Sequence, residues 1–128
     1  MFLLDTCALI WFTLDRNQIP KRTRALLVAG DTPLAVSAIT GFEIAMLVRK
    51  GRLRLPQATT EWLTRVLEEY VIDSLPLSLS VMVAAAELPA IHADPCDRMI
   101  IATAKAQHLT LVTADRVMPT YPGVKVVW

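Results

Sequence analysis

Short apolar runs alternate with longer amphipathic segments along this chain, and this alternation constrains the fold more than any other feature. The runs expected to form strands are residues 2–5, 34–37, 71–75, 109–113 and 124–128. The segments expected to form helices are about 6–14, 20–29, 40–50, 59–70 and 78–88, followed by one that begins at 95. Strands that alternate with helices form a parallel sheet with helices on both faces. We therefore predict a single-domain α/β/α sandwich over residues 1–128, with a central, mostly parallel sheet.

The composition excludes several classes of protein. No basic region precedes the apolar start, and the longest uncharged stretch, Ser74–Ala86, is shorter than the roughly 20 residues of a membrane span. The two cysteines are too few for a disulfide scaffold or a zinc site, so we expect reduced thiols in a cytoplasm. The net charge of +1 gives no overall attraction to nucleic acid. A hydrophobic fraction of 54% and a mean hydropathy of +0.44 predict a sizeable exposed apolar patch.

Four acidic residues stand where strands are expected to end or helices to begin: Asp5, Glu43, Asp97 and Asp115. Asp5 ends the first strand, Asp115 follows the fourth, and Glu43 lies in the first turn after the second. Open parallel sheets bind ligands at the carboxyl ends of their strands, so we expect these three acids to share that edge. Asp97 opens the helix that feeds the fourth strand. Connectivity is therefore expected to place it at the opposite edge, unless the loop at 88–95 carries it across.

Each acid also has a simpler explanation as a helix cap. Asp5 can cap the first helix, and Glu43 has capping-box spacing from Thr40. Asp97 stands at the third helical position, where a carboxylate complements the helix dipole, and Asp115 can cap a short turn. Three acids at one edge of one sheet nevertheless favour a shared site over three separate caps.

Four segments together resemble the PIN domain family. They are Leu3-Leu4-Asp5-Thr6, Ser37 with Glu43-Ile44-Ala45, His92 to Ala102, and Leu111 to Asp115. The pattern His-x-Asp-Pro-x-Asp-Arg is the most specific part, and within the family the chain is most similar to VapC-type toxins of bacterial toxin–antitoxin pairs. The resemblance implies that Asp97 belongs to the acidic pocket. The chain departs from the family at Cys96, where an aromatic residue is common, and we expect an inert, buried thiol there.

The resemblance also implies a ribonuclease that hydrolyses RNA phosphodiester bonds. An all-oxygen ligand set favours Mg²⁺ or Mn²⁺ over zinc. We expect Asp5 and Asp97 to hold the main ion. Asp115 and Glu43 are expected to complete the pocket, to orient metal-bound water or to hold a second ion.

Other polar side chains near the acids have less specific roles. The hydroxyls of Thr6 and Thr113 are expected to support the metal ligands, although either can bond to local backbone instead. His92 and His108 are interpreted as structural, because metal-bound water needs no histidine base.

Cationic contacts to RNA have two candidate sources, the basic groups at 21–24 and 49–54. Basic residues at a helix end also complement its dipole, so either group can be purely structural. Arg98 and Arg116 each follow a site acid in the sequence. We expect them to balance its charge rather than to contact phosphate.

The implied partners are a second copy of the chain and an antitoxin, because VapC-type toxins form homodimers and are inhibited by a cognate antitoxin. The segment 42–48 is apolar nearly all round, so it should be covered on more than one side. A phosphorelay receiver domain is the alternative from another class, but it has paired acids after the first strand and a lysine after the fifth. A catalytically inactive PIN-like binding module is a third possibility, which the presence of all four acids disfavours.

Overall fold

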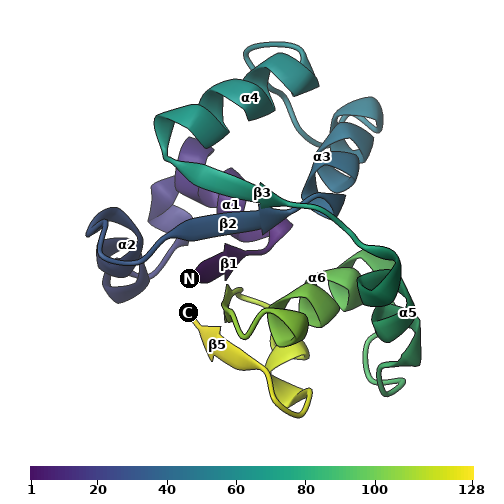
Figure 1. Ribbon diagram of the computed structural model, residues 1–128. Helices are drawn as coiled ribbons and strands as arrows, with labels where there is room; N and C mark the ends of the chain where they lie inside the picture. Colours follow the sequence, from purple (N-terminus) through teal and green to yellow (C-terminus); the bar gives the residue numbers. More distant parts are fainter.

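The computed structural model describes residues 1–128 and contains one five-stranded parallel sheet between layers of helices (Figure 1). The strands are β1 (Phe2–Leu4), β2 (Leu34–Ser37), β3 (Ile72–Leu75), β4 (Thr110–Val112) and β5 (Lys125–Val127). The helices are α1 (Thr6–Leu14), α2 (Lys21–Val28), α3 (Ile39–Arg49), α4 (Thr59–Glu69), α5 (Leu79–Glu87) and α6 (Pro95–Ala106). Two short 3-10 helices span Arg16–Gln18 and Met118–Thr120. The predicted α/β/α fold is confirmed.

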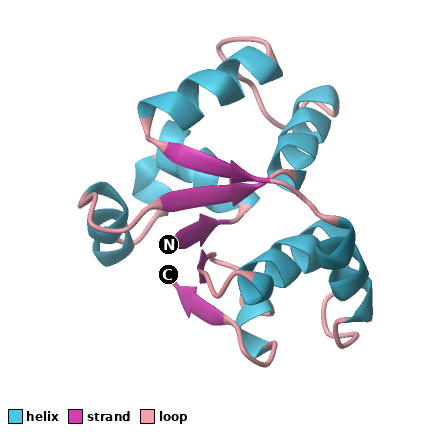
Figure 2. Cartoon of the chain, viewed as in Figure 1, coloured by secondary structure: helices cyan, strands magenta, loops and turns pink.

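The strand order is β3-β2-β1-β4-β5, and every neighbouring pair is parallel. Figure 2 shows the strands of this sheet with the helices around them. β1 is central, and Leu4 lies between Val36 of β2 and Val112 of β4. The chain builds the sheet outward on one side of β1 and then crosses to the other side. Such a switch point is where open α/β sheets bind ligands. Receiver domains have the order 2-1-3-4-5, so the structure contradicts the receiver alternative.

The central strands are apolar on both faces because each face is covered by a helical layer. One set of strand residues packs in the cluster that contains α6: Leu3, Ala35 and Leu111. The alternate set packs in the cluster that contains α1, α3 and α4: Leu4, Val36 and Val112. Side chains of successive residues point to opposite faces of a strand, so both layers are anchored by the same short segments. Because both layers hold these strands, the carboxyl ends of β1 and β4 are fixed in position. Asp5 and Asp115, which follow those ends, are positioned in the same way.

The helix cap predicted from the sequence is present at the start of α6 but not at the start of α3. Asp94 caps α6, and its carboxylate accepts a 2.9 Å hydrogen bond from the Cys96 amide. α3 begins at Ile39 with no side-chain cap, because the chain is already helical at Ala38. Thr40 therefore lies inside the first turn rather than before it, and the capping box predicted for Thr40 and Glu43 is wrong.

The expectation that connectivity would put Asp97 at the opposite edge is also wrong. The last residues of α6 lead directly into β4, and the Leu109 amide donates to the Ala104 carbonyl at that end. A helix that enters a parallel strand from the amino edge must run antiparallel to that strand. Its first turn, with Asp97, therefore lies toward the carboxyl edge. The position of Asp97 thus follows from topology.

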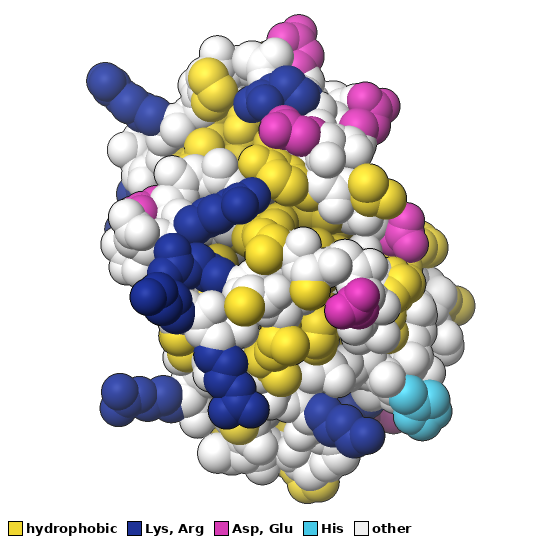
Figure 3. All heavy atoms as spheres, turned by 90° about the vertical axis from the view of Figure 1, so that its left-hand side faces the viewer, with side chains coloured by type: hydrophobic (Ala, Val, Ile, Leu, Met, Phe, Trp, Pro, Cys, Tyr) yellow, Lys and Arg dark blue, Asp and Glu magenta, His cyan; other side chains and the backbone are white.

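Apolar side chains are exposed over several parts of the surface. Leu79, Met82 and Val83 of α5 are exposed, and Phe42 of α3 keeps 59% of its surface accessible. The expectation that segment 42–48 is covered on more than one side therefore does not hold for Phe42 within this chain. Figure 3 shows Lys and Arg side chains gathered beside apolar ones on the face where α2 and both termini lie. None of the helices has the length and apolar character of a membrane span.

Candidate metal-binding and catalytic site

A cavity of about 570 Å³ lies between α1, α3, the start of α6 and the segment after β4. The four acids predicted from the sequence all line it: Asp5, Glu43, Asp97 and Asp115. They come from four different elements that converge at the switch between β1 and β4. The structure therefore brings together the whole predicted set.

Asp5 is a helix cap and a cavity residue at the same time. Its Oδ1 accepts a 2.7 Å hydrogen bond from the Ala8 amide, and its Oδ2 accepts a 2.5 Å bond from the Thr113 hydroxyl. Only 6% of the residue is exposed. Burial raises the pKa of Asp5 above its ordinary value, although both hydrogen bonds oppose the rise and Asp115 adds to it.

Glu43 is held by the hydroxyl of Thr6, which donates a 2.6 Å hydrogen bond to Oε1. The same hydroxyl lies 3.2 Å from the Thr40 hydroxyl, so the first turns of α1 and α3 meet through side chains. Burial raises the pKa of Glu43, and the negative charges of Asp94 and Asp5 raise it further. Both threonines expected to support the acids, Thr6 and Thr113, thus donate to a cavity carboxylate. Thr113 also accepts from the Asp115 amide.

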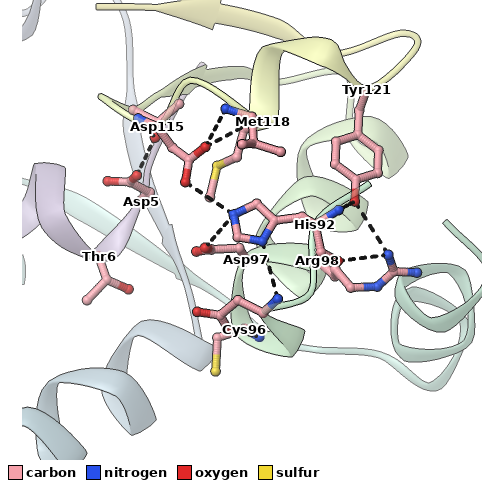
Figure 4. A network of polar contacts seen from close by, with 12 residues as sticks. Asp5, Thr6, His92, Cys96, Asp97, Arg98, Asp115, Met118 and Tyr121 are labelled. Carbon is pink, nitrogen blue, oxygen red and sulfur yellow. Dashed lines mark hydrogen bonds and ion pairs between the residues drawn. The ribbon is translucent and has the colours of Figure 1, made fainter. Parts of the chain in front are cut away.

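His92 lies between two of the acids (Figure 4). Its Nε2 is 3.1 Å from Oδ2 of Asp97 and 3.2 Å from Oδ2 of Asp115. Burial raises the pKa of Asp97 to about 7, with Asp94 and Glu43 adding to the rise and His92 opposing it. Burial also favours a higher pKa for Asp115. Hydrogen bonds from His92 and from the amides of residues 117 and 118 outweigh this effect, so the pKa of Asp115 is lowered.

Two groups of side chains have the spacing of a metal site. One is His92, Asp97 and Asp115, and the other is Glu43, Asp94 and Asp97; within each, the ligand atoms lie within 4.8 Å of one another. Asp97 belongs to both groups. Asp5 lines the same cavity but is in neither group, and each of its carboxylate oxygens accepts a hydrogen bond.

The loop that carries His92 is fixed by Arg98, whose guanidinium points away from the acids. Arg98 donates to five backbone carbonyls and to one hydroxyl: those of Ala85, Ala86, Leu88, Pro89 and His92, and that of Tyr121. The Tyr121 hydroxyl in turn accepts a 2.7 Å bond from the His92 amide. The expectation that Arg98 balances the charge of the acids is therefore wrong, because its donors serve the orphan carbonyls at the end of α5.

Two further side chains take part in the site, although the sequence did not single them out as site residues. Asp94 lines the cavity as well as capping α6, and His92 reaches its acids. Both belong to the segment His92–Asp97, in which His92, Asp94 and Asp97 lie two and three residues apart. This spacing of possible metal ligands was the signal in the sequence that could have identified them as site residues.

Both thiols are free and line the cavity. Burial raises the pKa of Cys96 to about 11, with Glu43 and Asp94 contributing next. The pKa of Cys7 is also raised to about 11 by burial and by the surrounding acids. Both are therefore protonated at neutral pH and are poor nucleophiles. Cys96 is half-buried rather than fully buried as expected.

Of the two basic groups, only the one at 49–54 reaches the acids. Lys50 and Arg52 line the cavity, whereas Arg22 of the 21–24 group lines a separate hollow beside Trp128. Arg116 is exposed and forms no ion pair, so it does not balance the charge of Asp115 in this structure.

The sequence and the fold are those of a known family. The PIN domain family model matches residues 2–124, and the chain belongs to that family. Among characterised relatives, Ribonuclease VapC22 of Mycobacterium tuberculosis is 31% identical over 129 residues, which cover 98% of this chain and 97% of that protein.

Solved structures show the same fold. A toxin–antitoxin complex from Klebsiella pneumoniae has a chain with a TM-score of 0.64 and 21% identity, covering 100% of this chain and 97% of that one. VapBC2 from Rickettsia felis, bound to a promoter DNA fragment, gives a TM-score of 0.72 and 19% identity, covering 99% and 98%. At these identities the likeness establishes the fold.

Proposed function

We propose that this protein is a Mg²⁺-dependent endoribonuclease that hydrolyses RNA phosphodiester bonds. The observation that carries the proposal is the convergence of Asp5, Glu43, Asp97 and Asp115 in one cavity. Four carboxylates this close repel one another, and a hard divalent cation is the partner that would neutralise them. The 31% identity to Ribonuclease VapC22 over nearly the whole chain supports the same activity.

The donor set fits Mg²⁺ or Mn²⁺ because it consists almost entirely of carboxylate oxygens. We assign Asp97 as the central ligand, since it belongs to both groups with metal-ligand spacing. Asp5 and Asp115 are proposed as further ligands, and Glu43 as a residue that orients water or holds a second ion. A bound divalent cation supplies Lewis-acid activation of water and charge neutralisation at the phosphate.

The protein's own groups hold the acids in their working positions. Thr113 fixes one oxygen of Asp5, and Thr6 fixes one oxygen of Glu43. These bonds favour the ionised carboxylates, which is the form that binds a cation. We propose that His92 orients Asp97 and Asp115 rather than acting as the general base, because its Nε2 already contacts both.

Cleavage of RNA by the purified protein tests the proposal. Asp5→Asn and Asp97→Asn should each lower the rate in Mg²⁺ by about 100-fold or more, as expected when one charged group of a catalytic site is lost. Chelation should abolish cleavage, and Asp73→Asn, an exposed acid of β3 outside the cavity, serves as the matched control. A wild-type rate in either cavity variant would contradict the assignment. RNA binding without cleavage would instead favour an inactive PIN-like module.

We further propose that the protein acts as the toxin of a toxin–antitoxin pair and forms a homodimer. The relationship to VapC22 supports this role, and the Klebsiella protein of the same fold was solved in a toxin–antitoxin complex. The exposed apolar side chains of α5, Leu79 with Met82 and Val83, are the surface offered for the second copy. Light scattering that showed a monomer at every accessible concentration would contradict the dimer.

A further inference from the structure

One face of α3 lines the cavity with residues that the acids do not explain. Phe42, Met46 and Lys50 follow one another at a spacing of four residues, so they lie on the same side of the helix. Arg52 continues this wall beyond the end of α3, and Trp11 of α1 faces the same cavity. The cavity therefore has an acidic part and a second part that is apolar and basic.

Phe42 is the most accessible aromatic side chain of this wall. It keeps 59% of its surface exposed while it stands next to Glu43 in the sequence. A single exposed apolar residue needs no explanation in itself. The position of Phe42 does, because it lines the same cavity as the four acids and the two cations, Lys50 and Arg52.

The chemistry of the wall matches that of a nucleotide. Aromatic side chains stack on the face of any base, and Lys and Arg neutralise the backbone phosphates. A protein segment would use the apolar side chains but would not need two cations beside four acids. The volume of about 570 Å³ lies within the range of about 300–1,000 Å³ that ligand pockets occupy, so it holds more than an ion and one phosphate.

We propose that this wall is a substrate subsite for an unpaired nucleotide next to the scissile phosphodiester. The base stacks on Phe42, and Lys50 and Arg52 contact phosphates of the same strand. The inference rests on the proposed ribonuclease function and adds to it the side chains that would hold the nucleotide, Phe42, Lys50 and Arg52. A base inside a duplex is already stacked on both sides and cannot present its face to Phe42.

Binding can be measured separately from cleavage. Fluorescence anisotropy in EDTA, with a labelled 12-nucleotide single-stranded RNA and the same strand in a duplex, reports affinity without turnover. Phe42→Ala should weaken binding of the single strand by roughly 5- to 150-fold, the effect of removing one stacking contact of about 1–3 kcal/mol. Phe42→Trp should restore it, and binding of the duplex should not change. Val71→Ala, another exposed apolar residue outside the cavity, is the control.

The role of the two cations, Lys50 and Arg52, can be tested against two other basic residues in the same segment, 49–54. Lys50→Gln with Arg52→Gln should reduce the slope of log affinity against log salt by about 1.4, the value for two phosphate contacts on a single strand. Arg49→Gln with Arg54→Gln removes two exposed charges nearby that do not line the cavity. This control should leave the slope closer to that of the wild-type protein.

The outcomes separate this inference from the proposed function. If the wild-type protein binds RNA through Phe42 but never cleaves it, the proposed function fails and the subsite stands. If it cleaves RNA and Phe42→Ala binds the single strand as the wild type does, the subsite is overturned. Unchanged RNA binding together with weakened binding of a purified antitoxin would also overturn it, by assigning the wall to a protein partner.

Discussion

The hydroxyl of Thr113 donates a 2.5 Å hydrogen bond to Oδ2 of Asp5, although the two residues are 108 positions apart in the chain. The bond joins the carboxyl ends of β1 and β4, the two strands at the switch point of the sheet. Asp5 is buried, so this donor is one of two that oppose the burial-driven rise of its pKa. The fold thus stabilises the ionised form of Asp5 with a residue from the far end of the sequence.

Replacing Thr113 by valine keeps its shape and removes the donor. The loss of a hydrogen bond to a charged group costs about 1.5–3 kcal/mol, so we expect a weaker affinity for Mg²⁺ and slower cleavage at neutral pH. The pKa of Asp5 should rise further. Thr110→Val in the same strand is the control, since the Thr110 hydroxyl has no hydrogen bond. Equal Mg²⁺ affinities for wild type and Thr113→Val, measured by calorimetry, would show that this bond does not support the site.

Asp97 should make stability depend on pH in the absence of metal. Burial and neighbouring charges raise its pKa from 3.8 to about 7, so the folded protein binds more protons than the unfolded chain between these values. The free energy of unfolding contributed by Asp97 is therefore fully present below about pH 4 and is lost as the pH rises through about 7. In EDTA, Asp97→Asn should be more stable than the wild type at pH 8, and this advantage should shrink toward pH 4.

Thermal unfolding of the wild type, Asp97→Asn and Asp73→Asn at each pH checks this prediction. Asp73 is exposed and outside the cavity, so its variant should follow the wild type. A difference between Asp97→Asn and the wild type that stayed constant from pH 4 to pH 8 would contradict the raised pKa.

Arg98 should contribute to stability through its bonds to backbone carbonyls. Arg98→Ala leaves the carbonyls at the end of α5 without a donor, and we expect a loss of about 2–4 kcal/mol in the free energy of unfolding. Arg98→Lys should recover only part of it, because an ammonium cannot reproduce the planar fork. Urea unfolding of these variants beside Arg116→Ala, an exposed arginine with no ion pair, measures the effect. A similar small loss in all three would remove the role assigned to Arg98.

The two histidines allow a direct test of where a cation binds. Nε2 of His92 contacts Oδ2 of Asp97 and Oδ2 of Asp115, two proposed ligands of the cation, whereas His108 is exposed and does not line the cavity. We expect added Mg²⁺ to shift the ring resonances of His92 in NMR spectra and to leave those of His108 unchanged. Equal shifts for both histidines, or none for His92, would place the ion elsewhere.

The sequence was sufficient for the elements and for three of the four acids, because apolar strands and helix starts leave local patterns. The fourth acid, Asp97, was assigned to the pocket only by the resemblance to the PIN domain family. The sequence was not sufficient for contacts between distant side chains. Nothing local to Thr40 indicates that its hydroxyl meets Thr6 rather than capping α3. Likewise, Arg98 follows an acid in the sequence, but its helix turns it toward the end of α5. The edge of the sheet at which Asp97 lies could have been predicted from the direction of α6 alone. A helix in a parallel crossover runs antiparallel to the strands, so its first turn lies at their carboxyl edge.

The central claim is that the acids of this cavity form a divalent-cation site, and Asp97 is the residue common to both possible ligand groups. Anomalous diffraction from crystals soaked in Mn²⁺ tests it most directly, since the ion is located without reference to activity. We predict a peak at direct coordination distance from an oxygen of Asp97, with at least one of Asp5, Glu43 and Asp115 beside it, and no such peak in Asp97→Asn crystals. Well-ordered crystals with Mn²⁺ bound only outside this cavity would contradict the account.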